Sequence, residues 1–148
     1  TMDGGKAIKE SRDFDVPMCA AHFSYHAGWA DKLEHAGFGP DPRPLGVAAQ
    51  VIPWNFPLLM MAWKIGPALA AGNSVIVKPA EQTSMSALRL AELAKEAGIP
   101  RGVLQVLPGT GPQVGQPLGL HGDVDMVSFT GSTRTNTSLP PSSGWMKP

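Results

Sequence analysis

The stretch 45–81 constrains the fold more than any other part of the chain. Residues 45–52 form an apolar run, which is typical of a strand buried on both faces of a parallel sheet. A proline-flanked turn over 53–57 leads into a nearly all-apolar helix over 56–71, and a second short strand follows over 74–77. Polar side chains stand where each expected strand stops, and open α/β sheets bind ligands at the carboxyl ends of their strands. The stretch therefore predicts a strand–helix–strand unit with a ligand site at its polar end.

The rest of the chain continues the same alternation. A helix is expected over 83–97, a third strand over 103–107, a glycine-rich turn over 109–115 and a fourth strand over 125–129. Alternating strands and helices favour right-handed crossovers. The predicted fold is α/β, a partial doubly wound parallel sheet of the Rossmann-like type.

Two prolines and the helix ends add detail to this prediction. Pro117 falls inside the short helix after the glycine turn, where an interior proline costs about 3 kcal/mol and predicts a kink or a shortened helix. Pro67 predicts a bend or break in the helix over 56–71. Either Thr83 or Ser84 is expected to cap the next helix.

The first 42 residues predict a helical segment and a turn-rich connector. Apolar residues recur at helical spacing over 16–33, with Pro17 suited to the first turn and Asp15 to the cap. Cys19 stands among alanines on this helix, so a small buried residue is a better interpretation than a nucleophile.

Three histidines in this segment raise the question of a metal site. His22 and His26 are four residues apart and His35 follows, but no carboxylate completes a recognised metal motif. We therefore predict no metal and interpret the pair as part of a half-buried helix.

Composition excludes several classes of function. The 12 basic and 12 acidic side chains of this 148-residue chain cancel, so neither nucleic acid nor a membrane surface is an expected partner. A single cysteine excludes an internal disulfide framework and fits a reducing compartment. No uninterrupted apolar window reaches the length of a membrane span, and the first residues do not form a signal peptide. We expect a cytoplasmic protein.

The chain changes character near its end. Residues 136–148 hold adjacent prolines and several serines with little to bury, which predicts a disordered tail. The predicted division is a helical segment over 1–42, a partial dinucleotide-binding domain over 43–135 and this divergent tail.

Three side chains at the expected strand ends could carry chemistry. The amide of Asn55 could donate a hydrogen bond to a developing oxyanion, or could hold its own turn. Lys78 and Glu81, just past a strand, could grip the hydroxyls of a ribose, although spacing alone favours a solvated surface pair. Glycines over 109–115 would let a phosphate approach the backbone, but the spacing departs from the usual dinucleotide pattern and is a weak signal.

Four motifs in order alter these alternatives. The chain closely resembles the NAD(P)-dependent aldehyde dehydrogenases from about Lys6 to Arg134. The motifs are Pro53-Trp54-Asn55-Phe56-Pro57, Trp63-Lys64-Ile65-Gly66-Pro67-Ala68-Leu69-Ala70-Ala71-Gly72-Asn73, Lys78-Pro79-Ala80-Glu81 and Phe129-Thr130-Gly131-Ser132-Thr133.

The resemblance implies an oxidoreductase that converts an aldehyde to a carboxylic acid. It implies that Asn55 stabilises the thiohemiacetal oxyanion and that Lys78 and Glu81 hold the adenosine ribose. The other cofactor-binding residues that it implies are Ile52 and Trp54 along the cleft, Gly111 and Gly115 near the adenine, and Ser132 at the pyrophosphate. The Glu81 carboxylate would repel the 2′-phosphate of NADP, so NAD is the expected cofactor. A small aldehyde is the expected substrate and a homo-oligomer the expected assembly of the whole protein.

One departure from the family limits the expected activity. In the family the nucleophilic cysteine and the glutamate base lie beyond the Phe-Thr-Gly-Ser segment, and this chain has neither there, while Cys19 matches no catalytic position. We therefore expect no dehydrogenase turnover from this chain alone. The alternatives are a non-enzymatic nucleotide-binding or interaction module, and a chain that does not fold stably by itself.

Overall fold

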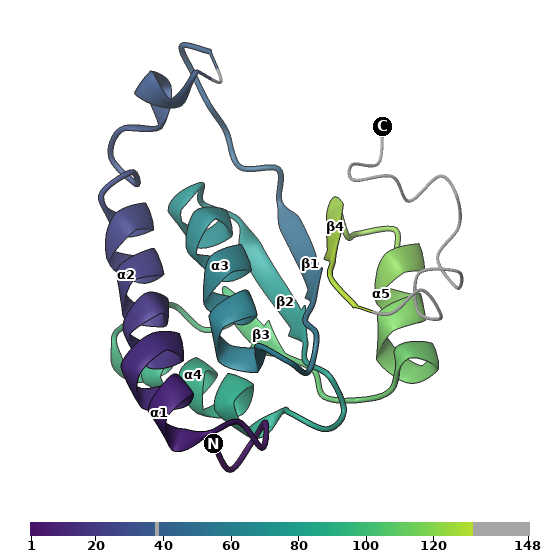
Figure 1. Ribbon diagram of the computed structural model, residues 1–148. Coiled ribbons are helices and arrows are strands. Elements are labelled where there is room, and N and C mark those ends of the chain that lie inside the picture. Colours follow the sequence, from purple (N-terminus) through teal and green to yellow (C-terminus); the bar gives the residue numbers. More distant parts are fainter. Residues whose placement is uncertain (38, 132–148) are drawn as a thin grey trace.

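The computed structural model describes residues 1–37 and 39–131, which form a four-stranded parallel sheet with helices on both faces (Figure 1). The strands are β1 Val47–Val51, β2 Ser74–Lys78, β3 Leu104–Val106 and β4 Met126–Phe129. The helical segments are α1 Ile8–Glu10, η1 Ser11–Asp15, α2 Val16–Ala27, η2 Leu33–Ala36, α3 Pro57–Ala70, α4 Met85–Glu96, η3 Gly111–Gly115 and α5 Gln116–Leu120. The predicted α/β fold is confirmed. The tail predicted over 136–148 lies outside the described residues.

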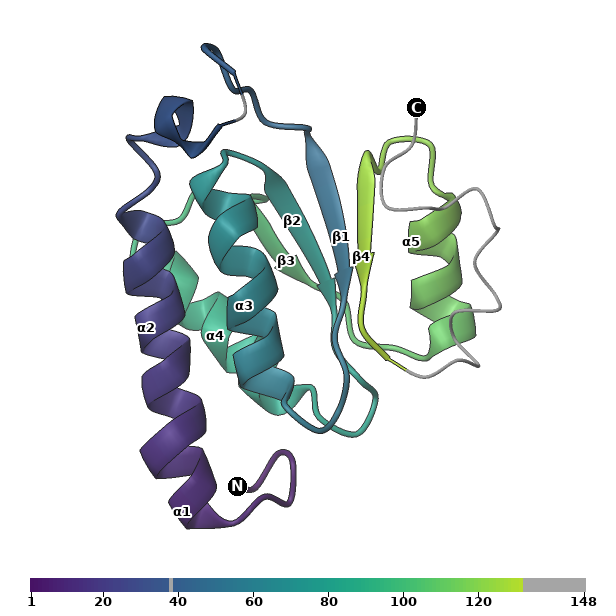
Figure 2. The same cartoon turned by 45° about the horizontal axis from the view of Figure 1, so that its top comes forward.

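The order of the strands in the sheet is β3-β2-β1-β4, so the chain reverses its direction of travel between β1 and β4. These two strands lie side by side at the centre of Figure 2, with Val51 opposite both Lys78 of β2 and Phe129 of β4. Three strand ends therefore meet at the switch point, which is where open α/β sheets bind ligands.

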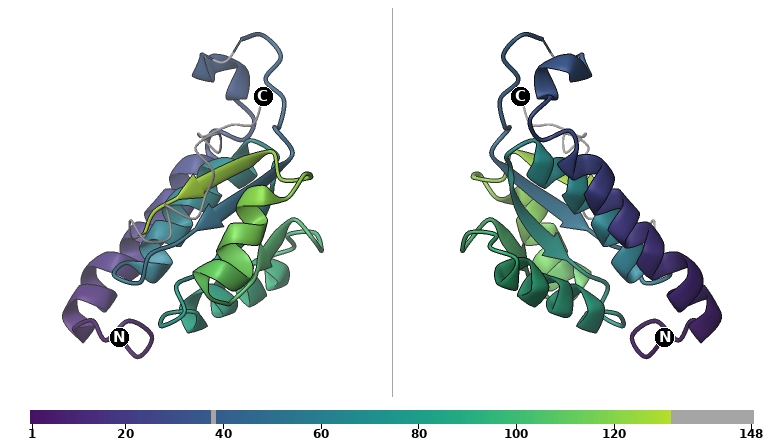
Figure 3. Two further views of the ribbon diagram at one scale, coloured as in Figure 1. Left: turned by 90° about the vertical axis from the view of Figure 1, so that its right-hand side faces the viewer. Right: turned by 90° about the vertical axis from the view of Figure 1, so that its left-hand side faces the viewer.

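The two faces of the sheet have separate cores, because side chains alternate along each strand. Val75 and Val77 of β2 face α3 and α4, where they pack with Met61, Ile65 and Ala87. Ile76, between them, packs on the opposite face with the cluster around Leu118 of α5. Figure 3, in its left view, shows α5 in front of this opposite face of the sheet. This division explains why the residues of β2 are apolar on both sides.

The N-terminal helix, made of α1, η1 and α2, lies beside α3 (Figure 1). Cys19 packs with Leu59 and Ala62 of α3, which confirms its prediction as a small buried residue. Gly66 permits the close approach of the two helices, since a Cβ there would lie 2.9 Å from Cδ2 of His26. No helix within the described residues is long and apolar enough to cross a membrane.

Two π-helical segments overturn part of the sequence prediction for the helices. The helix predicted to begin at Val16 begins at Ile8, and Asp15 is a helical residue that makes no capping bond. Pro17 follows the π-helical η1, in which the N–H of Val16 donates to the carbonyl of Ser11. A π turn widens the helix locally and so makes room for a proline ring.

The same arrangement recurs at Pro117. There η3 precedes the proline, the N–H of Gln116 donates to the carbonyl of Gly111, and the helix continues to Leu120. In α3, Pro67 also lies inside a helix that runs on to Ala70, so it causes no break.

The start of α4 also differs from the prediction. Neither Thr83 nor Ser84 caps it with a side chain. Asp3 does so instead, because its carboxylate accepts hydrogen bonds from the backbone N–H groups of Met85 and Ser86. A cap supplied from 82 residues away is a tertiary contact, which no local pattern encodes.

Candidate functional site

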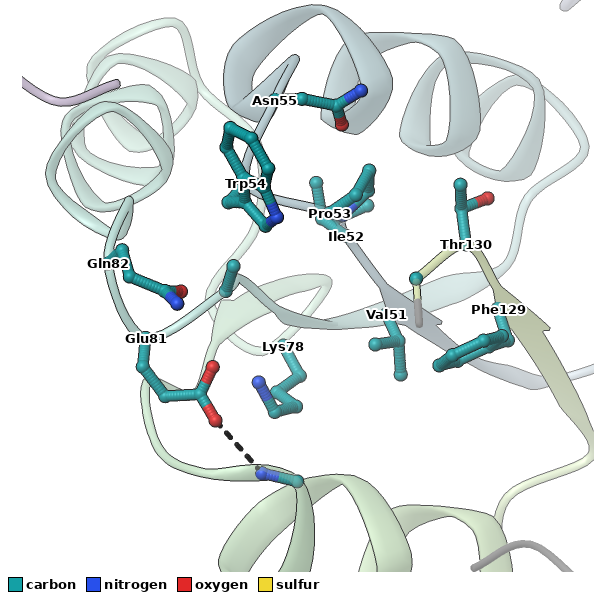
Figure 4. Close-up of a pocket in the computed structure, with 13 residues that line it drawn as sticks. Val51, Ile52, Pro53, Trp54, Asn55, Lys78, Glu81, Gln82, Phe129 and Thr130 are labelled. Atoms are coloured by element: carbon teal, nitrogen blue, oxygen red, sulfur yellow. Dashed lines mark hydrogen bonds between the residues drawn. The ribbon is translucent and has the colours of Figure 1, made fainter. Parts of the chain in front are cut away.

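A cleft of about 580 Å³ opens where β1, β2 and β4 end (Figure 4). Its lining residues come from the last residue of each of these strands, from the loops that follow them and from the start of η3. They are Val51, Ile52, Pro53, Trp54, Asn55, Lys78, Ala80, Glu81, Gln82, Gly111, Phe129, Thr130 and Gly131. The cleft thus lies at the topological switch point, and it includes Asn55, Lys78 and Glu81, which the sequence singled out.

Lys78 ends β2 and is only 3 % exposed, so it is not the solvated surface residue that spacing alone favoured. Its Nζ donates to the carbonyl of Pro79 at 2.8 Å. Burial lowers the pKa of Lys78, and the nearby Glu81 carboxylate opposes that effect. A lysine amine has three N–H donors, so a partly desolvated one favours additional acceptors in the cleft.

Glu81 lies opposite this amine and connects the loop after β2 to η3. Its Oε1 accepts a hydrogen bond from the backbone N–H of Gly111 at 3.2 Å, shown as the dashed line in Figure 4. Thr110 and Gln113 close the same helix start with a reciprocal capping box. A carboxylate is favoured at a helix N-terminus. The backbone N–H of Gly111, which the sequence predicted to be open to a phosphate, therefore donates to the Glu81 carboxylate instead.

The two glycines of this turn that were predicted to contact a cofactor differ in position. Gly111 lines the cleft, whereas Gly115 is buried behind it. A Cβ at Gly115 would lie 3.4 Å from Cδ of Lys78. Gly115 therefore supports the stem of the lysine and is not itself part of the lining.

The loop after β1 supplies the other end of the cleft. Ile52 is buried, and its N–H donates to the carbonyl of Lys78 at 3.0 Å, while Trp54 is 61 % exposed. Figure 4 places the Asn55 amide beyond Trp54, at the end of the cleft away from Glu81. Asn55 is exposed, so its amide is available to a ligand and is not fixed in a dry core.

The end of β4 adds residues that the sequence did not assign to the site. Phe129 and Thr130 line the cleft, although they had been noted only as parts of a motif. Ser132, which was predicted to bind the pyrophosphate, lies outside the described residues. Gln82 was also missed, and its position directly after Glu81 is the signal that could have found it.

Lys64 of α3 was also missed as a contributor to this region. Its Nζ donates to the carbonyl of Val51 at 2.9 Å and to that of Ser128 at 3.2 Å, so it bridges β1 and β4 beneath the cleft. Burial lowers its pKa to about 8. The signal was a single charge within an otherwise apolar helix.

The described residues contain no cluster of three or more side chains suited to a metal ion. His22 stacks on Trp63, which is a packing contact between α2 and α3, and on His26 within α2. The Cys19 thiol is buried in the same layer, where desolvation and the Asp15 carboxylate raise its pKa to about 11. A thiol with a raised pKa is a poor nucleophile.

Comparison with known proteins shows the family of the chain. The model of the aldehyde dehydrogenase family matches residues 1–144. The chain is 54 % identical to an aminoacetaldehyde dehydrogenase of Pseudomonas aeruginosa over 91 % of its length, and 45 % identical to human aldehyde dehydrogenase 1A1 over 97 %. It spans only 29 % and 30 % of those proteins.

Solved structures agree with the sequence relatives. The crystal structure of PnpE in complex with nicotinamide adenine dinucleotide matches with a TM-score of 0.85 and 47 % identity, covering 92 % of this chain and 30 % of that one. The NAD+ complex of an aldehyde dehydrogenase from Bacillus cereus matches with a TM-score of 0.84 and 42 % identity, covering 91 % and 29 %. On the family match and these relatives together, the chain belongs to the aldehyde dehydrogenase family.

Proposed function

We propose that the cleft binds NAD, and that the chain is part of the cofactor-binding unit of an enzyme that oxidises an aldehyde to a carboxylic acid. The observation that carries the proposal is the meeting of Lys78, Glu81 and Asn55 along one cleft at the switch point of a parallel sheet. Two similar structures contain NAD, which supports this choice of ligand. In this proposal residues 43–135 bind the nucleotide, and residues 1–42 cover α3 and brace the site loops.

The adenosine ribose would lie between Lys78 and Glu81. One N–H of the lysine amine is directed at the carbonyl of Pro79, which leaves two donors for hydroxyl oxygens. One Glu81 oxygen is held by Gly111, which leaves the other to accept from a ribose hydroxyl. Ile52 and Trp54 supply apolar surface along the cleft, and Ser132 is proposed at the pyrophosphate. Gly111 and Gly115 are proposed to let the helix approach the adenine.

The same carboxylate favours NAD over NADP. A 2′-phosphate would add negative charge beside Glu81, at a helix N-terminus whose favourable field that carboxylate already uses. Glu81 would thus bind the free hydroxyl and repel the phosphorylated one.

Asn55 would act at the opposite end of the cleft, where the carbonyl of a bound aldehyde would lie. Its exposed amide would donate to the oxyanion that forms when a thiolate adds to the carbonyl. A single donor of this kind contributes about 2.7–4 kcal/mol in acyl-transfer chemistry. The amide would therefore serve the reacting carbonyl and contribute little to holding the nucleotide.

A second function, nucleotide binding without turnover, is favoured by the state of Cys19. It is the one cysteine in the sequence, it is 5 % exposed, and burial raises its pKa to about 11. It also packs against α3 and does not line the cleft. We propose that this chain by itself binds NAD and does not oxidise aldehydes.

Calorimetric titration of the chain with three ligands tests the proposal. NAD and ADP-ribose should both bind saturably, because both carry the adenosine ribose that Lys78 and Glu81 are proposed to hold. Nicotinamide mononucleotide lacks that group and should give a flat trace at the same concentrations. A flat trace for NAD would overturn both cofactor-binding functions for this chain. Aldehyde-dependent NADH formation would overturn the second function alone.

A further inference from the structure

The N-terminal segment, defined here as residues 1–7, contacts the loop that carries Asn55 and the start of α4, the helix that follows the Glu81 loop. A turn folds the segment back on itself, with the N–H of Gly5 donating to the carbonyl of Thr1 at 2.9 Å and Gly5 at a φ of +66°. Figure 1 shows this end of the chain beside α1 and the start of α4. The turn therefore presents Asp3 in one direction and Lys6 in another.

Asp3 is fixed to α4, the helix that follows the Glu81 loop. Its Oδ1 accepts from the N–H of Met85 at 3.1 Å, and its Oδ2 accepts from the N–H of Ser86 at 2.9 Å and from the Ser86 hydroxyl. A carboxylate at this position satisfies free N–H groups and is favoured by the helix dipole. Since the loop 79–84 ends at this helix, Asp3 fixes the far end of the loop that carries Glu81.

Lys6 is fixed to the loop that carries Asn55. Its Nζ lies 3.4 Å from the ring centroid of Phe56, the residue after Asn55, and 2.8 Å from Oδ2 of Asp15. The side chains of Lys6 and Asp15 are only 18 % and 12 % exposed, so solvent screens this arrangement weakly. Gly4 lies against the same loop and the start of α3, since a Cβ there would be 3.9 Å from the carbonyl oxygen of Trp54 and 3.7 Å from Cγ of Pro57. The segment therefore holds the Asn55 loop from outside the cleft.

We propose that Asp3 and Lys6 are positioning residues that hold the Asn55 loop and the Glu81 loop at a fixed separation across the cleft. This inference rests on the proposed function, because the separation matters only if one ligand spans both loops. Neither residue touches the ligand in this proposal. Asp3 acts through the first turn of α4, and Lys6 acts through the ring of Phe56.

Fluorine NMR of the chain labelled with 5-fluorotryptophan measures the loop directly. Trp54 lines the cleft and directly precedes Asn55 in this loop, and its signal is assigned from the Trp54→Phe variant (Figure 4). Lys6→Met should shift or broaden the Trp54 signal and leave that of Trp63 in place. Lys6→Arg keeps the cation and should therefore give the same Trp54 signal as the parent. Lys9→Met removes an equal charge from the exposed surface of α1 and should change nothing.

NAD titration of the same variants gives the functional readout. Lys6→Met and Asp3→Ala should each weaken NAD binding roughly three- to tenfold, since each loosens one loop, while Lys6→Arg and Lys9→Met bind as the parent does. A role limited to stability would lower the unfolding temperature and leave the affinity of the folded chain and its Trp54 signal unchanged. That result would overturn the proposal.

Two further outcomes are separable from these. If Lys6→Met does not fold by circular dichroism, Phe56→Leu removes the ring alone and must show the same change in the Trp54 signal, or the proposal fails. If the parent chain does not bind NAD, the proposed function fails. The Trp54 signal then decides whether Lys6 holds the loop, and an unchanged signal in Lys6→Met would overturn the inference on its own.

Discussion

The amino and carboxyl ends of the strands in the parallel sheet differ in how their backbone groups are bonded. At the amino end, side chains from other segments bond to the backbone: Asn73 Oδ1 accepts from the N–H of Gly46 at 3.0 Å, and Asp125 Oδ2 accepts from that of Val47 at 2.8 Å. At the carboxyl end the chain diverges around the cleft, and the half-buried amine of Lys64 and the buried amine of Lys78 bond to nearby carbonyls. The amino end is therefore closed for stability, whereas the carboxyl end is left open to a ligand.

The comparison predicts that changes at the amino end affect folding alone, and Gly46→Ala should have the largest effect. Gly46 has a φ of +125°, and a Cβ there would lie 2.2 Å from Oδ2 of Asp125. The side chain of Asp125 would have to leave Val47, so we expect a loss of about 2–4 kcal/mol in the free energy of unfolding. Urea denaturation measures it. Gly122→Ala is the matched control, because a Cβ there meets no atom within 4 Å. Equal effects of the two changes would contradict the closed-end interpretation.

Lys78→Met should give the reverse result at the open end. Removing the amine eliminates the donors proposed for the ribose, which we expect to weaken NAD binding about thirtyfold, or about 2 kcal/mol. The free energy of unfolding should not fall, because burial lowers the pKa of Lys78 and so disfavours its charged form in the fold. Calorimetry and urea denaturation measure the two quantities on one sample. Lys95→Met, on the exposed face of α4, is the control. If the variant is destabilised but still binds NAD, Lys78 stabilises the fold, as the residues at the amino end do, and does not bind the ligand.

Glu81→Gln should have a smaller effect, on the choice of ligand. The amide keeps an oxygen for Gly111 but removes the charge proposed to repel a 2′-phosphate. We expect the ratio of NADP to NAD affinity to rise about tenfold, or about 1.4 kcal/mol. Gln82→Ala changes the neighbouring residue of the cleft without altering charge, and it should leave this ratio unchanged. An unaltered ratio in Glu81→Gln would remove the electrostatic basis for preferring NAD.

The pH dependence of stability should report on Lys64, which lies beneath the junction of β1 and β4. Its pKa is about 8 in the fold and 10.5 ordinarily, so above pH 8 the unfolded chain binds more protons and stability rises with pH. Cys19 opposes this above pH 9, because its pKa rises from 9.0 to about 11 on folding. Between pH 7.5 and 9 the parent should gain up to about 1 kcal/mol relative to Lys64→Met. Parallel curves for the two proteins would contradict the desolvation of this amine.

The contrast between the two ends also explains what the sequence could predict. Strands, their parallel order and the polar residues at their carboxyl ends follow from local patterns, so Lys78, Glu81 and Asn55 could be placed before the structure was known. The contacts that close the other end join Val47 to Asp125, which are 78 residues apart, and no local signal pairs them. Asp3 on α4 and Lys64 beneath the cleft are similar cases. The two π-helical segments were missed because Pro17 alone predicts the start of a helix and Pro117 alone predicts a kink or a shortened helix. Only the widened turn before each proline allows the helix to continue.

Asn55→Ala should have the smallest measured effect, and it divides the open end into two functions. Asn55 is exposed at the end of the cleft away from Glu81, so the free energy of unfolding should change by less than about 0.5 kcal/mol. NAD affinity should stay within about twofold, because an oxyanion donor acts on a charge that the bound cofactor alone does not develop. Calorimetric titration of the parent and the variant measures the NAD affinity, and urea denaturation measures the free energy of unfolding. A tenfold loss of NAD affinity would instead make Asn55 a nucleotide ligand, and the cleft would then be one binding surface with no separate reaction end. If Asn55 serves the reaction and Lys78 binds the cofactor, NAD affinity should be nearly unchanged in Asn55→Ala and strongly reduced in Lys78→Met.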